Sequence, residues 1–437
     1  MTGLQPDATV AARRSLVVVA TASAIMLIVT GVRQTTGLFV APIHEATGMS
    51  LVSISLALAI GQFMWGAAQS VFGVLADRYG SALVLLTGAL LLAAGNVITT
   101  FSTTPWMLIA SFGVLAAAGA GAGSFSVLIG ATARQLAPEQ RAFGAGIINA
   151  GGSVGQMIFA PLVQVVISAS GWVVAMYALA AASLATIPFI RPLAGKGGEP
   201  ARAAPDPVSI AQANAAAPTV AAQTPPLGLR AQLRAALRDR GYWLLTIGFF
   251  TCGFHIAFLV THLPGEVGLC GLPPSVAATS LAIIGLANVG GSLASGWLGN
   301  VVRMKWLLFW VYVLRAVAIA LYLSLPRTPT TFYVFAALLG VTWLSTVPPT
   351  AGIVGKLFGV RYLATLFGLT MLSHQLGAFF GAWLGGVARV AFGDYNWMWY
   401  ADMTLALLAA IINLPIRGTG AGSRLSLIHI SEPTRRS

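Results

Sequence analysis

Twelve apolar segments constrain this chain more than any other feature of its sequence. Each has about the 20 mainly apolar residues that an α-helix needs to cross a lipid bilayer. Only 8% of the 437 residues are charged, against roughly 25% in a typical soluble domain. We therefore expect an all-α integral membrane protein and exclude a soluble or disordered chain. The segments lie at residues 15–42, 51–76, 81–102, 105–133, 142–169, 171–190, 242–264, 274–299, 305–325, 331–355, 362–388 and 395–416.

A stretch of different composition separates the first six segments from the last six. It is rich in Ala, Pro and basic residues, which is typical of a disordered linker. Near its end, Arg230, Arg234 and Arg238 recur at four-residue spacing. This spacing favours either a short amphipathic helix on the membrane surface or a solvated basic segment. The expected units are an N-terminal six-helix bundle, a cytoplasmic linker and a C-terminal six-helix bundle, at residues 1–190, 191–241 and 242–416.

A tail at residues 417–437 follows the twelfth segment. Its stretch 425–435, with the sequence LSLIHISEPTR, resembles a translated adaptor from a sequencing library rather than a natural terminus. We assign no function to these residues. All twelve segments precede the tail, so the expected helical core is complete without it.

The basic residues predict the orientation of the chain in the membrane. One side is taken to hold the N-terminus, the loops after even-numbered segments and the C-terminus. That side then carries 20 of the 24 Lys and Arg residues, and the other side carries only Arg327 and Arg389. Since basic residues accumulate in cytoplasmic loops, both termini are expected in the cytoplasm. The same asymmetry accounts for the net charge of +13 without nucleic acid as a partner.

The two halves of the chain share features at a nearly constant spacing. An ordered series of this kind indicates two parallel six-helix repeats that rock against each other around a central cavity. Corresponding residues are offset by 222 positions, as in Gly31–Gly253, Arg33–His255, Pro42–Pro264, Gly130–Gly352 and Arg134–Lys356.

The loop after the second segment carries Gly73, Asp77, Arg78 and Gly80 in the sequence GVLADRYG. It resembles the G-x-x-x-D-R-x-G signature of the major facilitator superfamily, although the two basic residues that usually follow are replaced by Ser and Ala. The resemblance implies that these four residues form a conformational latch. Asp77 would then accept hydrogen bonds from the backbone N–H groups at a helix N-terminus and form an ion pair with a basic residue. The candidate partners of Asp77 are Arg134 and Arg141.

Within that superfamily, three short stretches narrow the resemblance. Residues 31–34, 252–255 and 373–375 look like bacterial members of the monocarboxylate and oxalate/formate transporter branch, although the acid–Gly motif usual in helix 1 of the monocarboxylate branch is absent. The resemblance implies a multi-pass protein of the bacterial cytoplasmic (inner) membrane, in which helix 1 lines the central cavity and helices 5 and 11 flank it.

Two cations and one acid lie inside the expected helices, where a charge costs about 2.5–3.5 kcal/mol at the bilayer centre. Arg33, deep in the first helix, is expected either to bind an anion, forking onto a carboxylate, or to make structural hydrogen bonds. Arg315 and Asp402 lie in helices 9 and 12, which are neighbours in the resembled fold. They are expected to form a structural pair or, alternatively, a proton relay.

Histidines and amides supply the other candidates. His255, the repeat mate of Arg33, is expected to face it across the cavity and bind the anion or carry a proton, or else to be a neutral histidine bonded to a carbonyl. His374 and Gln375 are expected either to contact the substrate or to form hydrogen bonds between helices. The remaining candidates are Asn149 and Trp343 as substrate contacts, and His262 as an outer gate or an interfacial residue.

Together these features predict a secondary active transporter that moves a small organic anion, a carboxylate, by alternating access with proton symport. The lipid bilayer and the small molecule are the expected partners, and the protein is expected to be a monomer. An exporter of drug-like or amphipathic compounds and a non-transporting membrane sensor are the alternatives. No enzyme, metal or cofactor constellation and no Walker-type loop is present in the sequence.

Overall fold

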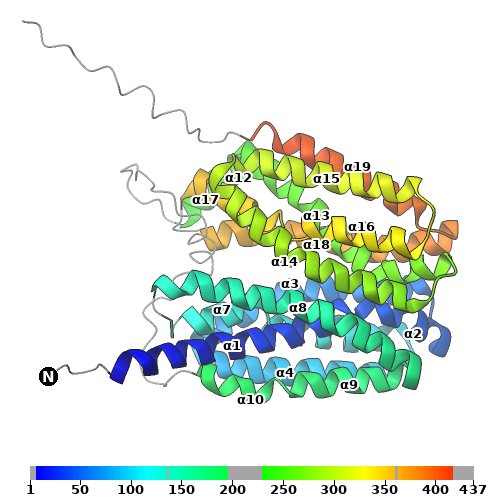
Figure 1. The fold of residues 1–437 in the computed structure, drawn as a ribbon, viewed down its shortest axis with the longest axis horizontal. Helices are drawn as coiled ribbons and strands as arrows, with labels where there is room; N and C mark the ends of the chain where they lie inside the picture. The colour runs from blue at the N-terminus through cyan, green and yellow to red at the C-terminus, as the bar shows by residue number, and fades with distance from the viewer. Residues whose placement is uncertain (1–5, 134, 137, 195–228, 360–362, 417–437) are drawn as a thin grey trace, which may run out of the picture.

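The computed structural model describes residues 6–133, 135–136, 138–194, 229–359 and 363–416, and these residues fold almost entirely into helices (Figure 1). The predicted linker falls largely outside this range, at residues 195–228, and the predicted tail at residues 417–437 falls wholly outside it. Residues Leu229–Arg238, shortly before the seventh segment, do form a helix. This helix carries Arg230, Arg234 and Arg238 on its exposed side, as an amphipathic helix should.

The first half of the chain, from Pro6 to Ala194, forms one group of helices. Its longest members are α1, α3 and α8. The helices are α1 (Pro6–Gln34), η1 (Thr36–Phe39), α2 (Val40–Thr47), α3 (Leu51–Tyr79), α4 (Ser81–Thr99), α5 (Pro105–Leu108), η2 (Ile109–Ala116), α6 (Ala117–Ala122), α7 (Phe125–Ala133), α8 (Pro138–Ser170), α9 (Trp172–Leu184), α10 (Ile187–Ile190) and η3 (Arg191–Ala194).

The second half forms another group, and local signals set its boundaries. Asp239 caps α13 by accepting from the Tyr242 amide at 2.7 Å, and prolines begin α14 and α16. The helices are α12 (Leu229–Arg238), α13 (Arg240–Leu269), α14 (Pro274–Val301), α15 (Met304–Ser324), α16 (Pro329–Thr342), α17 (Val347–Phe358), α18 (Leu363–Phe392) and α19 (Asn396–Asn413).

Ten stretches of the described chain are long and apolar enough to cross a membrane, and they match the first ten predicted segments in order. The last two predicted segments correspond to α18 and α19, of 30 and 18 residues. Neither is among the ten, and each carries polar residues in its interior. His374 and Gln375 interrupt the apolar run of α18, and Asp402 interrupts that of α19. The fold is therefore an all-helical membrane bundle with at least ten helices of spanning character among the described residues.

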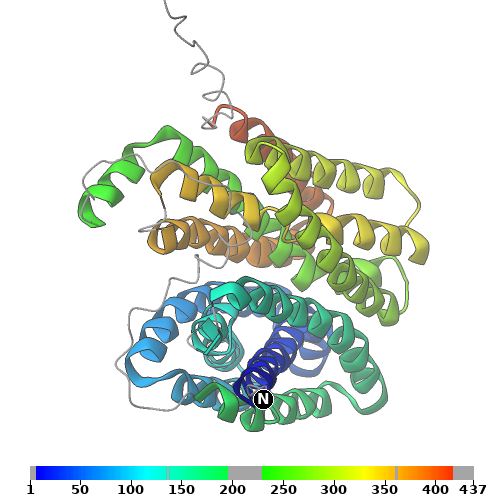
Figure 2. The ribbon, with the colours of Figure 1, turned by 60° about the vertical axis from the view of Figure 1, so that its left-hand side comes forward.

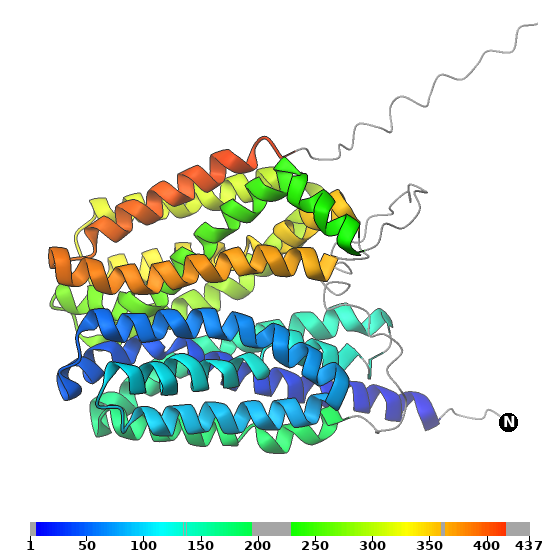
Figure 3. The same cartoon turned by 180° about the vertical axis from the view of Figure 1, so that it is seen from behind.

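The two groups lie one above the other as layers of roughly parallel helices, which Figure 2 and Figure 3 show from two further directions. Across their boundary α3 packs along α18, and α8 packs along α14. Glycines allow this close approach: Gly66 of α3 faces the side chain of Gln375, and Gly285 of α14 faces the backbone of Ser153.

Several predicted segments are interrupted in the described structure, and three of these interruptions lie near the buried charges or their cavity; the one in the tenth segment is expected from Pro348 and Pro349. The first segment changes from α1 to η1 at Thr35, directly after Arg33. The tenth segment breaks between Thr342 and Val347, so its prolines lie in the first turn of α17, where a missing N–H costs nothing. The fourth segment contains a π-helix, η2. This form occurs mostly as single turns inside α-helices, and frequently at functional sites.

Candidate functional site

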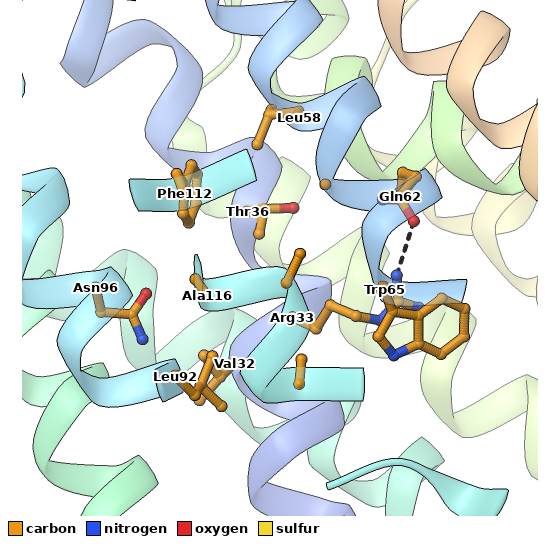
Figure 4. A pocket seen from close by; sticks show the side chains of 13 residues that line it. Val32, Arg33, Thr36, Leu58, Gln62, Trp65, Leu92, Asn96, Phe112 and Ala116 are labelled. Atoms are coloured by element: carbon orange, nitrogen blue, oxygen red, sulfur yellow. Dashed lines mark hydrogen bonds between the residues drawn. The ribbon is translucent and has the colours of Figure 1, made fainter. Parts of the chain in front are cut away.

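Arg33 lies in the last turn of α1, where its side chain turns toward α3 (Figure 4). Its Nη1 donates to Oε1 of Gln62 at 2.9 Å, and its guanidinium carbon lies 4.0 Å from the centroid of the Trp65 ring. The amide and the aromatic face both stabilise a cation away from water. The remaining N–H groups of Arg33 have no hydrogen-bond acceptor among the described residues, so the guanidinium keeps capacity for a further anionic partner.

Arg33 and Gln62 line a small cavity of about 40 Å³. All of its walls come from the first half of the chain, chiefly from α1, α3, α4 and η2 (Figure 4). His255 is not among the lining residues of this cavity. The lining residues are Val32, Arg33, Thr36, Leu58, Gly61, Gln62, Trp65, Leu92, Asn96, Phe112, Ala116, Ala117 and Ala120.

His255 lies inside the second half, with none of its surface exposed. Its Nδ1 lies 2.5 Å from Oδ2 of Asp402, and its ring meets the Trp343 ring edge-on at a centroid distance of 5.9 Å. Within the described part of the chain, the other ring nitrogen of His255 and the other carboxylate oxygen of Asp402 have no hydrogen-bond partner. The pair is buried, and each member keeps one ring nitrogen or carboxylate oxygen without a partner among the residues described. A carboxylate beside an imidazole can take up a proton.

Arg315 does not pair with Asp402, contrary to the expectation from the sequence. Its Nη2 donates instead to the backbone oxygens of Thr342 and Trp343, at 2.8 and 3.4 Å. These carbonyls end α16 at the break before α17, so they have no intrahelical donor. A cation at a helix C-terminus also interacts favourably with the helix dipole. Arg315 therefore caps a broken helix.

His374 and Gln375 lie at the boundary between the two halves, on α18. The ring of His374 packs against Phe249 at a centroid distance of 5.2 Å. Gln375 crosses to the first half and packs against Gly66, next in sequence to Trp65. Nδ1 of His374 and Oε1 of Gln375 have no hydrogen-bond partner among the described residues, so both keep polar capacity.

The other predicted residues are spread more widely. His262 is buried, and its Nε2 bonds to the backbone oxygen of Ala382 at 2.6 Å, so it is held inside the second half. Asn149 is half-buried on α8. Trp343 is buried at the break after α16, where it meets His255.

The predicted latch is described only in part. Gly80 ends α3 with a φ of 92°, a conformation that suits glycine, and Gly73 faces open space. The Arg78 guanidinium lies 5.3 Å from the ring centroid of Tyr79. The side chains of Asp77 and Arg141, and the whole of Arg134, lie outside the described residues, so their predicted pairing stays a prediction.

The sequence analysis missed two groups of polar residues. Gln62 and Asn96 line the cavity beside Arg33, and a polar residue within an apolar segment was the signal available for both. Glu266 was missed as a second buried acid, because it lies near the end of its segment. It is only 6% exposed, accepts from the Tyr322 hydroxyl at 2.5 Å and lies 3.8 Å from Nε of Arg327.

Long apolar helices, helix breaks beside buried charges and polar groups at the boundary of two helical layers define a membrane transport protein. The sequence profile of the Major Facilitator Superfamily matches residues 22–309, and the chain belongs to this family. Among its relatives, monocarboxylate transporter 13 of Bos taurus is 26% identical over 366 residues, 82% of this chain and 78% of the relative. The oxalate:formate antiporter of Oxalobacter formigenes is 23% identical over 373 residues, 84% of each chain. The chain is thus a multi-pass membrane transporter and not an enzyme.

Proposed function

We propose that this protein is a secondary active transporter that moves a small organic anion, a carboxylate, by alternating access. The observation that carries the proposal is the guanidinium of Arg33, placed at a helix break, with N–H groups left over after its bond to Gln62. A guanidinium recognises a carboxylate with two parallel hydrogen bonds. The names of the two relatives, a monocarboxylate transporter and an oxalate:formate antiporter, support an anionic substrate.

His374 and Gln375 form the opposite side of the proposed substrate site. They come from the second half, and the side chain of Gln375 packs against Gly66, next to the Trp65 that contacts Arg33. A substrate contacted by both halves responds to their relative movement, which alternating access requires. Asn149 and Trp343 stay proposed substrate contacts on the sequence alone.

The proposed architecture has twelve spans, with α18 and α19 crossing the membrane as the last two. Helix contacts support two six-helix repeats, because the same pairs meet in each half. α1 packs along α8 as α13 packs along α18, and α4 packs along α9 as α15 packs along α19. The basic residues then favour cytoplasmic termini and a bacterial inner membrane. We further propose a monomer, with Gly73, Asp77, Arg78 and Gly80 as its cytoplasmic latch.

The proposed coupling ion is the proton, and His255 with Asp402 is its binding pair. Both side chains are fully buried, so a change in their joint charge carries a large free-energy difference between the two states of the transporter. Of the two roles expected for His255 from the sequence, anion binding and proton binding, this proposal takes proton binding. The other group beside the pair is Arg315, which caps α16.

Export of drug-like or amphipathic compounds is the second candidate function. One observation favours it: the cavity at Arg33 is largely apolar, and Gln62 and Trp65 already hold the guanidinium. In this case Arg33 is structural, and carboxylates are not substrates.

Uptake into proteoliposomes separates the two functions. The purified protein is reconstituted, and labelled formate, acetate, lactate and oxalate are offered with and without an inward proton gradient. The proposal predicts carboxylate accumulation that the gradient increases. Efflux of an amphipathic dye with no carboxylate uptake would establish the exporter instead.

A further inference from the structure

The cavity beside Arg33 contains a polar side chain that has no hydrogen-bond partner among the described residues. Asn96 of α4 is only 1% exposed, and neither its amide nitrogen nor its amide oxygen has a hydrogen-bond partner. An unsatisfied buried polar group costs about 1–3 kcal/mol. Asn96 and Arg33 stand on opposite sides of the cavity (Figure 4).

The wall between these two groups has an unusual backbone. It is formed partly by Phe112 and Ala116 of η2, the π-helical stretch of the fourth segment. A π-helical turn adds a residue to the helix circumference and displaces neighbouring side chains, and such turns occur frequently at functional sites. The other walls, including Leu58 and Leu92, are apolar. The cavity thus has a cation at one side, an amide at the other and apolar surface between.

The size of the cavity limits what it can hold. One water occupies about 10–15 Å³ by the same kind of measure. The volume of about 40 Å³ therefore accommodates about three non-hydrogen atoms without movement of the walls. Formate has three such atoms and acetate has four, whereas a benzene ring or a long alkyl chain requires the helices to separate.

We propose that this cavity, inside the first-half bundle, binds a one- or two-carbon carboxylate, with Asn96 as the residue that determines specificity. Arg33 donates to the carboxylate oxygens from one side of the cavity. The Asn96 amide nitrogen donates to a carboxylate oxygen from the other side, and Leu58, Leu92 and Phe112 exclude longer chains. This inference rests on the proposed function, and it adds a site inside one half to the contacts at the boundary.

The test measures binding to the purified full-length protein in detergent. Labelled acetate is bound in a scintillation proximity assay, and unlabelled formate, acetate, hexanoate and benzoate compete for it. The variants are Asn96→Leu, which removes the amide at similar volume, and Asn96→Asp, which places a negative charge against the anion. Asn413→Leu is the matched control, since Asn413 is also 1% exposed and bonds only within α19.

The expected result is that Asn96→Leu weakens acetate binding about 10-fold or more, as for one hydrogen bond to a charged group. Asn96→Asp weakens it further, and Asn413→Leu leaves it within about twofold. Asn96→Leu should keep or raise the unfolding temperature, because it removes a group that has no partner in the protein. Phe112→Trp, which fills the cavity without altering Asn96, should also abolish acetate binding.

Two results would overturn the inference while leaving the proposed function in place. One is acetate binding that Asn96→Leu and Phe112→Trp both leave unchanged, and the other is benzoate competing as well as acetate. If the wild-type protein binds no carboxylate at all, the proposed function fails together with the inference.

Discussion

Charged side chains inside this protein are stabilised by three kinds of partner. Arg33 contacts the Gln62 amide and the Trp65 ring. Arg315 donates to the carbonyl of Thr342 at the end of α16. His255 and Asp402 pair with each other. Each partner suits a different role. Backbone carbonyls fix a cation permanently, whereas an imidazole–carboxylate pair changes charge when a proton binds.

Asp402→Asn tests the proton role of the pair. The amide cannot carry the negative charge that makes proton binding to His255 favourable. We expect uptake to lose its response to a proton gradient, with exchange of substrate across the membrane retained. The measurement is uptake and counterflow in proteoliposomes. Asp394→Asn, in the loop before α19, should behave as wild type. Gradient-driven uptake that persists in Asp402→Asn would exclude the pair as the coupling site.

Replacing Arg315 tests its structural role. Arg315→Leu leaves the carbonyl of Thr342 without its donor and the carbonyl of Trp343 with only the Cys252 thiol, and we expect the free energy of unfolding to fall by about 1–3 kcal/mol. Thermal unfolding of the purified protein measures this loss. Arg303→Leu, which removes an exposed cation just before α15, is the matched control. Equal unfolding temperatures for the two variants would contradict the capping role.

The buried charges were predictable from the sequence, but their pairing was not. Arg33, Arg315 and Asp402 stand out because charges are rare in apolar segments. The sequence placed Arg315 and Asp402 on neighbouring helices, and α15 does pack along α19. The partner of Asp402 depends on the rotation of α19 about its own axis, which turns the carboxylate to His255. Sequence spacing does not determine that rotation.

Helix interruptions position the site at the level of single elements. The break after Thr342 had a clear signal, because Pro348 and Pro349 follow it. The change from α1 to η1 at Thr35 and the π-helix η2 had none, since neither contains proline. These unpredicted interruptions lie beside Arg33 and its cavity. They are stabilised by packing against other helices rather than by local sequence.

Gly37 of η1 tests the packing between the halves. It lies directly against the backbone oxygen of Val260 on α13, so a methyl group at this position collides with backbone. We expect Gly37→Ala to reduce transport at least 10-fold by keeping the two halves apart. Gly146→Ala, at a glycine that faces open space, is the control. Uptake and size-exclusion profiles are measured for both, and full transport by a folded Gly37→Ala protein would contradict the role of this contact.

At the scale of the whole molecule, composition and periodicity predicted the all-helical membrane fold. They also predicted the order of the ten helices of spanning character among the described residues. The arrangement in two layers, with α3 along α18 and α8 along α14, required the structure. Apolar patterning shows that a helix is buried in lipid or protein, but not which helix covers which.

The orientation of the whole chain has a direct test. With 20 of 24 basic residues on one side, a fusion of green fluorescent protein to the C-terminus should fluoresce in a bacterial host. Alkaline phosphatase at the same position should be inactive, because it requires export. The reverse pair of results would invert the predicted topology.

The central claim is that Arg33 binds a transported carboxylate, and uptake by Arg33→Gln tests it most directly. Wild type, Arg33→Gln, Arg33→Lys and the control Arg303→Leu are reconstituted at equal density and offered labelled acetate with an inward proton gradient. Loss of a charge-assisted pair predicts an uptake rate at least about 100-fold lower for Arg33→Gln. Arg33→Lys should lie in between, because it keeps the charge but not the fork. Uptake by Arg33→Gln equal to wild type would contradict the claim.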